Sequence, residues 1–339
     1  MQETDGERAK RAGDGMFVRT VFKSIRKDLE LLETQLLEAV QSPVERITEI
    51  GEHLARAGGK RLRPALFLLA ARSGAHFDLQ RAMPLAVAVE LIHMASLVHD
   101  DVLDHAGTRR GTPTANAKWG NQQAILAGDY LFARAFALIA GRGYGERISV
   151  LLSQLIMDLS AGEIVQNQEL YQPPRSLARY YERIARKTAN FLADCCEMGA
   201  NVAELSEAET EGLRRYGKAV GMAFQITDDL LDLLADPKKI GKPAGNDLRE
   251  GIVTLPVLRA LEVSPEKDEL LAIVTNPAMS SADVTQAIAM TKATDAVHYA
   301  EAQAKAFLSE AKEALPSTLP KDILRTYRQA ADYIAKREF

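Results

Sequence analysis

Cysteine is almost absent from this chain of 339 residues. The two cysteines that occur, Cys195 and Cys196, are adjacent and lie in the apolar-patterned run 191–203. So few cysteines exclude a disulfide framework and favour a reducing compartment. We therefore expect both thiols to pack in the core.

The chain also has little of what marks a secreted, membrane-spanning or nucleic-acid-binding protein. Its first fourteen residues mix both signs of charge without an apolar stretch, so they are not a secretory signal. No run approaches the roughly 18 apolar residues of a transmembrane helix. The formal net charge of -4 gives no reason to expect nucleic-acid binding. We expect a soluble, cytoplasmic protein with a flexible tail over residues 1–15.

Glycine, proline and aromatic residues are few, with 22 Gly, 13 Pro and 1 Trp. The glycines and prolines cluster between long stretches rich in Ala, Leu, Glu, Lys and Arg, which favours a nearly all-helical protein. Hydrophobic residues make up 47% of the chain, enough for a sizeable core. We predict an all-α fold, a single large helical bundle over residues 16–339. Helical periodicity recurs at about 17–40, 44–57, 62–74, 79–105, 121–140, 146–170, 176–203, 207–235, 254–262, 266–275, 281–291, 295–315 and 320–336.

No constellation for nucleophilic catalysis is present. The sequence lacks a Gly-x-Ser-x-Gly elbow, a Cys–His metal spacing and a Gly-rich nucleotide loop. Without a side-chain nucleophile, the chemistry indicated is the departure of a leaving group with the help of a metal ion.

Two copies of one eleven-residue pattern, at 94–104 and 222–232, are the most informative feature. Each copy places three aspartates on an apolar stretch, and on a helix the first and third are i,i+4 neighbours. Like charges at this spacing cost about 0.2–0.5 kcal/mol per pair even in solvent, so a cation must offset them. Sets of oxygen ligands suit Mg2+, which commonly joins carboxylates to substrate phosphates. The pattern predicts a clamp for a metal-bound diphosphate, formed by Asp100, Asp101, Asp104, Asp228, Asp229 and Asp232.

The longest irregular stretches, 105–118 and 237–253, follow directly after the two aspartate sets. Long loops in compact domains are usually functional. Both loops are basic, so we expect cations above the carboxylates. The basic residues concerned are Arg109, Arg110, Lys238, Lys239, Lys242 and Arg249.

A Gly-Gly-Lys turn at 58–60 is predicted to open a helix. Lys60 and Arg63 then lie beside helix N-terminal amides, which attract anions. A solvated surface is the alternative interpretation of this turn. The same alternative applies to Lys187 and Thr188 on an amphipathic helix.

Two histidines precede the first aspartate set on the same predicted helix. Only His93 shares a helical face with Asp100, through i,i+7 spacing, so it is the better candidate for a pocket residue. His99 is equally well explained as a packing residue or as a support behind the pocket.

Together these residues resemble the trans-isoprenyl diphosphate synthases, also called polyprenyl synthetases. The resemblance runs from Gly58 to the end of the chain, and the runs 90–101 and 333–337 are most similar to heptaprenyl diphosphate synthase component II. It implies the all-α isoprenoid-synthase fold, with both Asp helices facing across a central cavity. The motifs that carry it are Gly-Gly-Lys-Arg-Leu-Arg-Pro at 58–64, Asp-Asp-x-x-Asp at 100–104 with Arg109-Arg110-Gly111, Lys187-Thr188, Phe224-Gln225 before Asp-Asp-x-x-Asp at 228–232, and Gly241-Lys242.

The resemblance also implies an activity and a role for each motif residue. An allylic diphosphate, expected to be farnesyl diphosphate, would ionise with Mg2+, and isopentenyl diphosphate would then attack and lose a proton. Repetition would make a medium or long-chain all-trans polyprenyl diphosphate, heptaprenyl being favoured. Three Mg2+ would be held by Asp100, Asp104 and Asp228, with Asp101, Asp229 and Asp232 as neighbouring carboxylates. The allylic diphosphate would contact Arg109, Lys187, Thr188, Gln225 and Lys242, and isopentenyl diphosphate would contact Lys60, Arg63, His93 and Arg110.

Product length is expected to depend on the helix below the first aspartate set. A bulky aromatic five residues before Asp100 would form a floor about one turn, near 5.4 Å, down the helix. Ala95 and Ser96 occupy this region, so a long tail is expected, with close helix packing as the alternative reason for Ala95. One departure from the family pattern is Ile252, which stands where a lysine is common and removes one phosphate contact.

Three other interpretations compete with a prenyl synthase. A class I terpene cyclase would share the fold but would not need a second diphosphate site or a second complete aspartate set. A regulatory subunit would be marked by loss of first-set aspartates, and none is lost. Purely structural acidic helices would leave both sets and their basic loops unexplained. The synthase itself is expected to be a homodimer or a heterodimer with a small component I subunit.

Overall fold

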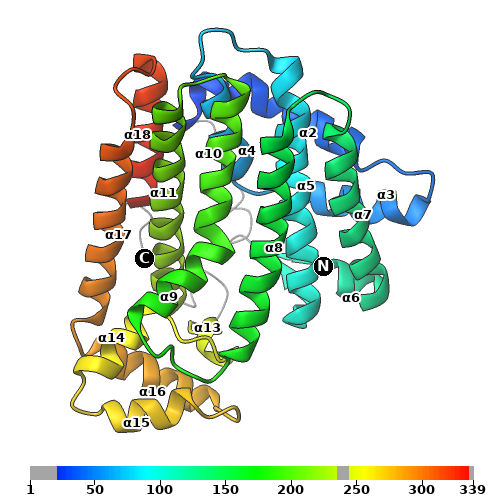
Figure 1. Ribbon diagram of the computed structural model, residues 1–339. Coiled ribbons are helices and arrows are strands. Elements are labelled where there is room, and N and C mark those ends of the chain that lie inside the picture. Colours follow the sequence, from blue (N-terminus) through cyan, green and yellow to red (C-terminus); the bar gives the residue numbers. More distant parts are fainter. Residues whose placement is uncertain (1–20, 235–243, 336–339) are drawn as a thin grey trace. The chain divides into compact units, whose positions relative to one another are not determined.

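The computed structural model describes residues 21–234 and 244–335. Within these ranges the chain consists of helices and one hairpin of two short strands, which confirms the all-α prediction (Figure 1). The predicted tail over 1–15 lies outside the described residues, so it stays a prediction, as does the single domain over 16–339.

The chain divides into two compact units. Unit 1 contains the described residues up to Ile156, with Asp194–Arg214 and Pro316–Tyr327, and unit 2 contains the rest. Four helices contribute residues to both units: α8 (Glu146–Gln168), α10 (Asn190–Val202), α11 (Glu207–Leu234) and α18 (Lys321–Ala335). Unit 1 also has η1 (Lys23–Ile25), α2 (Arg26–Ala39), α3 (Glu45–Arg56), α4 (Leu62–Ala71), α5 (Leu79–Leu103), β1 (Thr108–Arg109), β2 (Thr112–Pro113), α6 (Ala115–Trp119) and α7 (Asn121–Ile139). Unit 2 also has α9 (Leu177–Ile184), η2 (Ala185–Ala189), α13 (Asn246–Arg249), α14 (Leu255–Val263), α15 (Lys267–Val274), α16 (Ser281–Lys292) and α17 (Ala296–Ala314).

Helix α5 forms the centre of unit 1 because it is apolar on nearly every side. Its N-terminus is capped by Asp78, whose side chain accepts hydrogen bonds from the backbone N–H groups of Gln80 and Arg81. Helices α2, α4 and α7 pack around it (Figure 1). Leu85 and Val89 are completely buried, and each such side chain contributes about 1.5–3 kcal/mol by leaving water. This packing holds the polar C-terminal end of α5 in place.

Unit 2 is built on two apolar clusters. In one, Tyr180 of α9, Ile226 of α11 and Leu255 of α14 meet. In the other, α14, α15 and α16 pack on one another (Figure 1). The buried residues of α11 in the first cluster are Met222, Ile226 and Leu230, spaced by four, so the second aspartate set lies beside a face fixed by the core.

The sequence predicted most helix bounds within about two residues. The described part of the helix predicted over 17–40 is divided into η1 and α2, and the helix predicted over 62–74 ends at Ala71. Periodicity indicated one helix over 176–203, but a π-helical turn, η2, separates α9 from α10. The stretch 105–118 is not wholly irregular, since it forms the β1–β2 hairpin and begins α6. The expectation that no run is long and apolar enough to cross a membrane is wrong for two described helices, α5 and α8. In the structure 72% of the apolar window of α5 is buried, as in a core helix, and 28% of that of α8.

The two cysteines are in the core, as predicted. Both are free thiols and completely buried. Burial raises the pKa of the Cys195 and Cys196 thiols, so both stay protonated and unreactive.

Candidate functional site

The first aspartate set occupies the C-terminal turn of α5, in unit 1. Asp100 is half-buried, Asp101 is buried and Asp104 is the exposed C-cap residue, whose N–H donates to the Asp100 carbonyl at 2.8 Å. The helix dipole already places negative charge at this end, and the last turn carries no basic residue. Three carboxylates here therefore favour a bound cation.

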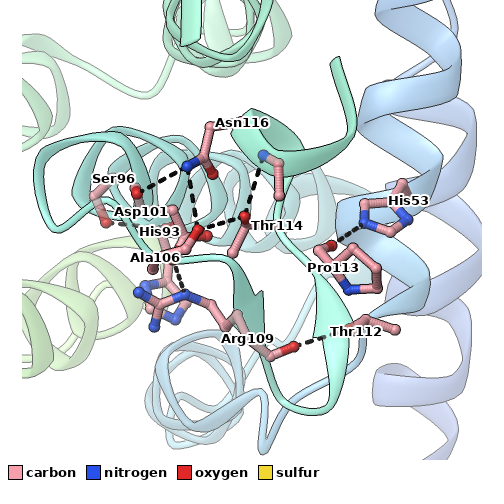
Figure 2. A network of polar contacts seen from close by, with 11 residues as sticks. His53, His93, Ser96, Asp101, Ala106, Arg109, Thr112, Pro113, Thr114 and Asn116 are labelled. Carbon is pink, nitrogen blue, oxygen red and sulfur yellow. Dashed lines mark hydrogen bonds and ion pairs between the residues drawn. The ribbon is translucent and has the colours of Figure 1, made fainter. Parts of the chain in front are cut away.

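Asp101 is turned toward the hairpin rather than toward its two partner aspartates. Its Oδ1 accepts a hydrogen bond of 2.6 Å from Nε of Arg109, and the Asp101 side chain is 3% exposed (Figure 2). Such charge-assisted hydrogen bonds are short and strong. Asp101 therefore orients Arg109.

The hairpin that carries Arg109 and Arg110 is tied to its surroundings at several points (Figure 2). Its two turn residues, Arg110 and Gly111, both have positive φ, of 52° and 77°, which is the pattern of a type I′ turn. Asn116 Nδ2 donates to the carbonyls of Asp101 and Ala106 at 3.2 and 3.1 Å. The remaining ties are Thr114 Oγ1 to the Ala106 carbonyl at 2.6 Å, Thr112 Oγ1 to the Arg109 carbonyl at 2.9 Å, and His53 Nε2 to the Pro113 carbonyl at 2.8 Å.

A basic cluster surrounds His93, on the same helix as the first aspartate set. Arg63 Nη1 lies 3.2 Å from His93 Nε2, and because a guanidinium only donates, Nε2 accepts and the proton is on Nδ1. Burial, and then Arg63 and Arg110, hold the pKa of His93 well below its usual 6.5. The imidazole is therefore neutral.

The Gly-Gly turn lies against Arg110. A Cβ on Gly59 would come within 2.5 Å of Arg110 Nη1, and Gly59 has a φ of 154°, which residues with a side chain rarely adopt. Arg63 and Arg110 thus lie beside His93, and Lys60 precedes Arg63 in the same turn. Their binding of isopentenyl diphosphate stays a prediction.

The second aspartate set lies near the C-terminal end of α11 and belongs to unit 2. Its middle residue, Asp229, is buried and accepts hydrogen bonds from Tyr180 Oη at 2.7 Å and Gln225 Nε2 at 3.0 Å. Burial raises the pKa of Asp229 to about 6. The amide of Gln225 is held in turn by Thr188 Oγ1, which donates to its Oε1 at 2.9 Å. Asp228 is half-buried.

Asp232 has a structural task that the sequence did not indicate. Its two carboxylate oxygens accept hydrogen bonds from the backbone N–H groups of Asn246 and Asp247, both at 3.1 Å. Burial, and then Asp232 and Asp229, raise the pKa of Asp247 well above its usual value. Asp247 is thus an acidic residue of this site that no sequence pattern revealed.

Lys187 is presented by the π-helical turn η2, a type of distortion often found at functional sites. Its Nζ lies 3.4 Å from Glu163 Oε2 and 3.1 Å from Gln166 Oε1. Lys187 therefore contacts Glu163 and Gln166, and Thr188 contacts Gln225, so neither residue lies on a plain solvated face. Lys242, with Lys238 and Lys239, lies outside the described residues.

The remaining predicted residues lie along α5. Ala95 is completely buried, and Ser96 Oγ donates to the His93 carbonyl at 2.9 Å (Figure 2). Their role in product length stays a prediction. His99 contacts α7, with Nε2 at 3.1 Å from the Ile125 carbonyl and its ring 5.6 Å from that of Phe132, which fits the packing interpretation.

No group of three or more His, Cys, Asp or Glu side chains in the described part of the chain is arranged closely enough to hold a metal ion. A cavity of about 30 Å³ does lie in unit 1 beside the basic cluster. Its polar lining includes Arg61, Glu90, Asp101, Arg109 and Arg110. The role of Arg61 and Glu90 was not apparent from the sequence, although Arg61 lies within the Gly-Gly-Lys-Arg motif.

Comparison of the sequence with known proteins indicates one family along most of the chain. A family model described as polyprenyl synthetase matches residues 44–291. Heptaprenyl diphosphate synthase component 2 of Geobacillus stearothermophilus is 42% identical over 324 residues, covering 96% of this chain and 100% of that protein. Component 2 of Bacillus subtilis is 38% identical over 325 residues, with coverage of 96% and 92%.

Comparison of the fold with solved structures indicates the same family. The crystal structure of heptaprenyl diphosphate synthase from Staphylococcus aureus matches with a TM-score of 0.87 and 30% identity, covering 93% of this chain and 99% of that one. A polyprenyl synthase from Caulobacter crescentus, complexed with calcium and isoprenyl diphosphate, matches with a TM-score of 0.88 and 34% identity, with coverage of 95% and 98%. The predicted isoprenoid-synthase fold is therefore confirmed, and the chain belongs to the polyprenyl synthetase family.

Proposed function

We propose that this chain condenses isopentenyl diphosphate with an allylic diphosphate, farnesyl diphosphate as the primer, to make an all-trans polyprenyl diphosphate of heptaprenyl length. The observation that carries the proposal is the pairing of two complete aspartate sets at helix C-terminal ends with a separate cationic cluster around His93. One kind of site suits a metal-bound diphosphate, and the other suits a diphosphate bound by cations alone. The names of the component 2 relatives support the heptaprenyl length.

The first and third aspartates of the first set and the first aspartate of the second set suit Mg2+, which prefers carboxylate oxygens and keeps several waters. We propose Asp100, Asp104 and Asp228 as the ligands, with three ions per active site. When bound, the ions would stabilise the negative charge that develops on the departing diphosphate. The Caulobacter neighbour, with calcium and isoprenyl diphosphate, supports an active site of this kind.

The reaction needs charge stabilisation more than a side-chain nucleophile. The C–O bond of the allylic substrate breaks, its electron pair leaves on the diphosphate, and an allylic carbocation remains. Arg109, oriented by Asp101, and Lys187 would stabilise the departing charge. The double bond of isopentenyl diphosphate then forms the new C–C bond. Loss of a proton to the released diphosphate restores an alkene.

Isopentenyl diphosphate keeps its own diphosphate throughout, so its site must bind without promoting departure. Lys60, Arg63 and Arg110 would supply positive charge, and guanidinium groups suit phosphate oxygens well. Neutral His93 would donate one hydrogen bond from Nδ1 without adding charge. This division of roles agrees with the absence of aspartates from the loop that carries Lys60.

We further propose a cytoplasmic enzyme that acts either as a homodimer or with a small component I subunit. The names of the two component 2 relatives support a second subunit. To decide, the purified chain alone is incubated with Mg2+, farnesyl diphosphate and labelled isopentenyl diphosphate, and product length is determined. A polyprenyl product shows a self-sufficient synthase.

The other outcomes of this experiment are equally informative. No product from a folded protein that still binds farnesyl diphosphate with Mg2+ points to a missing partner subunit. A hydrocarbon formed from farnesyl diphosphate alone would instead indicate a terpene cyclase. Failure to bind either diphosphate would refute the proposed function.

A further inference from the structure

Arg61 is a buried cation in the middle of the turn that presents Lys60 and Arg63. Its side chain is 5% exposed, and its backbone has a φ of 45°, an unfavourable conformation for a residue with a side chain. Arg61 is also the N-cap residue of α4, whose second residue is Arg63. Whatever fixes Arg61 therefore fixes the direction in which Arg63 leaves the turn.

The guanidinium of Arg61 joins three helices. Nη1 donates to Glu90 Oε1 of α5 at 2.6 Å, and Nη2 donates to the Ala55 carbonyl of α3 at 2.8 Å. Nε and Nη2 donate to the two oxygens of Glu33 in α2 at 2.7 and 3.1 Å. The Glu90 side chain is only 4% exposed, whereas that of Glu33 is 48% exposed. The Arg61–Glu90 contact is thus a buried ion pair.

Stability alone explains this pair poorly. Removing two charges from water can outweigh their attraction, and well-packed apolar residues often serve as well or better. Glu90 Oε2, moreover, is buried with no hydrogen-bond partner among the described residues, and the residue Glu90 lines the small cavity. Because the Arg61–Glu90 ion pair is costly to bury, its presence points to a role in fixing the positions of neighbouring side chains.

The geometry concerned is that of the cationic cluster. Glu90 and His93 are i,i+3 neighbours on α5, and Arg61 and Arg63 are two residues apart at the start of α4. The Arg61–Glu90 contact of 2.6 Å and the Arg63–His93 contact of 3.2 Å therefore connect the same two elements side by side. Loss of the first contact would change the spacing at the second.

We propose that the Arg61–Glu90 pair is the positioning device of the isopentenyl diphosphate site, holding Lys60, Arg63 and His93 at the spacing that a diphosphate requires. The inference rests on the proposed function. Neither member of the pair touches substrate, because Glu90 would repel a diphosphate and the guanidinium donors of Arg61 are engaged by Glu33, Ala55 and Glu90. Both residues act through their neighbours.

The test is the Glu90→Gln variant, which keeps the size of the side chain and removes its charge. KM for isopentenyl diphosphate is expected to rise roughly 10- to 100-fold, because small misplacements of binding groups have effects of this size. KM for farnesyl diphosphate is expected to stay at the wild-type value. Arg61→Lys keeps the positive charge but removes the planar guanidinium, and it should also raise KM for isopentenyl diphosphate without changing KM for farnesyl diphosphate. Glu33→Gln should raise KM for isopentenyl diphosphate by a smaller factor.

A matched control is available at the other end of α4. Arg72 and Asp28 also form a buried-carboxylate pair between α4 and α2, with contacts of 2.5 and 2.8 Å. Asp28→Asn should lower the thermal unfolding midpoint without changing either KM. If Glu90→Gln also lowers only the midpoint, or raises both KM values alike, the pair is structural and the inference is overturned.

A double-mutant cycle gives an independent readout. If Glu90 acts through Arg63, the effects of Glu90→Gln and Arg63→Lys on KM for isopentenyl diphosphate are less than additive. Additive effects would contradict the inference. Wild-type protein that makes no product and binds neither diphosphate would refute the proposed function itself, whereas an active wild type with an unaltered Glu90→Gln variant refutes only the positioning role.

Discussion

Nε of Arg109 lies 2.6 Å from Oδ1 of Asp101, and this contact divides the first aspartate set into two kinds of residue. Asp101 is buried and serves the hairpin, while Asp100 and Asp104 remain on the more exposed side of the helix end. In the second set the middle residue, Asp229, is likewise buried and bonded to Tyr180 and Gln225, while Asp232 accepts two backbone hydrogen bonds. In both sets the middle aspartate orients a neighbouring side chain that is proposed to bind diphosphate.

Asp101→Asn should therefore impair the enzyme without abolishing metal-dependent turnover. The neutral amide accepts a weaker hydrogen bond from Arg109, so the guanidinium is less well held. We expect kcat/KM for the allylic diphosphate to fall roughly 10- to 100-fold, the range typical of lost supporting contacts around metal sites. The concentration of Mg2+ needed for half-maximal rate should stay unchanged. A large increase in that concentration would show that Asp101 is itself a ligand.

Asp100→Ala is predicted to behave differently. Asp100 is a proposed Mg2+ ligand at the negative end of the α5 dipole, so its loss removes binding of the ion that neutralises the leaving group. We expect condensation to fall by at least about 10²- to 10³-fold, as when charge stabilisation is removed elsewhere. The variant should be as stable as the wild type without Mg2+, since removing one like charge relieves repulsion. Unchanged turnover would contradict the assignment of Asp100 as a ligand.

The sequence predicted the helices and the local motifs well because both depend on short-range patterns. The period of apolar residues located α5, α8 and α11, and the spacing of the aspartates placed them at helix ends. The hairpin at 108–113 was missed because its strands are two residues long, too short for alternation to be visible. The π turn that presents Lys187 likewise inserts one residue without a glycine or proline to mark it.

Contacts between segments that are distant in the sequence could not be predicted, for a different reason. Tyr180 lies 49 residues from Asp229, and Glu90 lies 29 residues from Arg61, so only the packed helices bring them together. The family resemblance implied that Asp101, Asp229 and Asp232 are neighbouring carboxylates, but it did not indicate which groups they contact. The difference between a buried middle aspartate and its less buried neighbours depends on which side of the helix the core covers, and that follows from tertiary packing.

Stability should depend on pH through His93. In the folded protein its pKa is held well below 6.5 by burial and by the adjacent guanidinium groups. Below pH 6.5 the unfolded chain therefore binds a proton that the folded chain does not, and stability falls as pH falls. His93→Gln should remove this contribution, which approaches about 1.4 kcal/mol per pH unit. Urea unfolding of both proteins between pH 5 and 7.5 measures it, and equal slopes would contradict the prediction.

Ala95→Tyr is predicted to shorten the product. Ala95 lies five residues before Asp100 on α5 and is completely buried, so a tyrosine ring must project into whatever space lies beside the helix. If that space is the path of the growing tail, the ring forms a floor to this path five residues before Asp100 along the helix. Products are then shorter, while KM for isopentenyl diphosphate stays at the wild-type value.

The same substitution separates the two interpretations of Ala95. If the alanine is there only for close helix packing, the ring overfills the core and lowers the free energy of unfolding by about 1–3 kcal/mol, with product length unchanged. Product analysis and thermal unfolding of Ala95→Tyr, compared with Ala95→Ser as a small-residue control, distinguish these cases. A shortened product from a stable variant assigns Ala95 to the tail path, whereas an unstable variant that still makes the full-length product assigns it to packing.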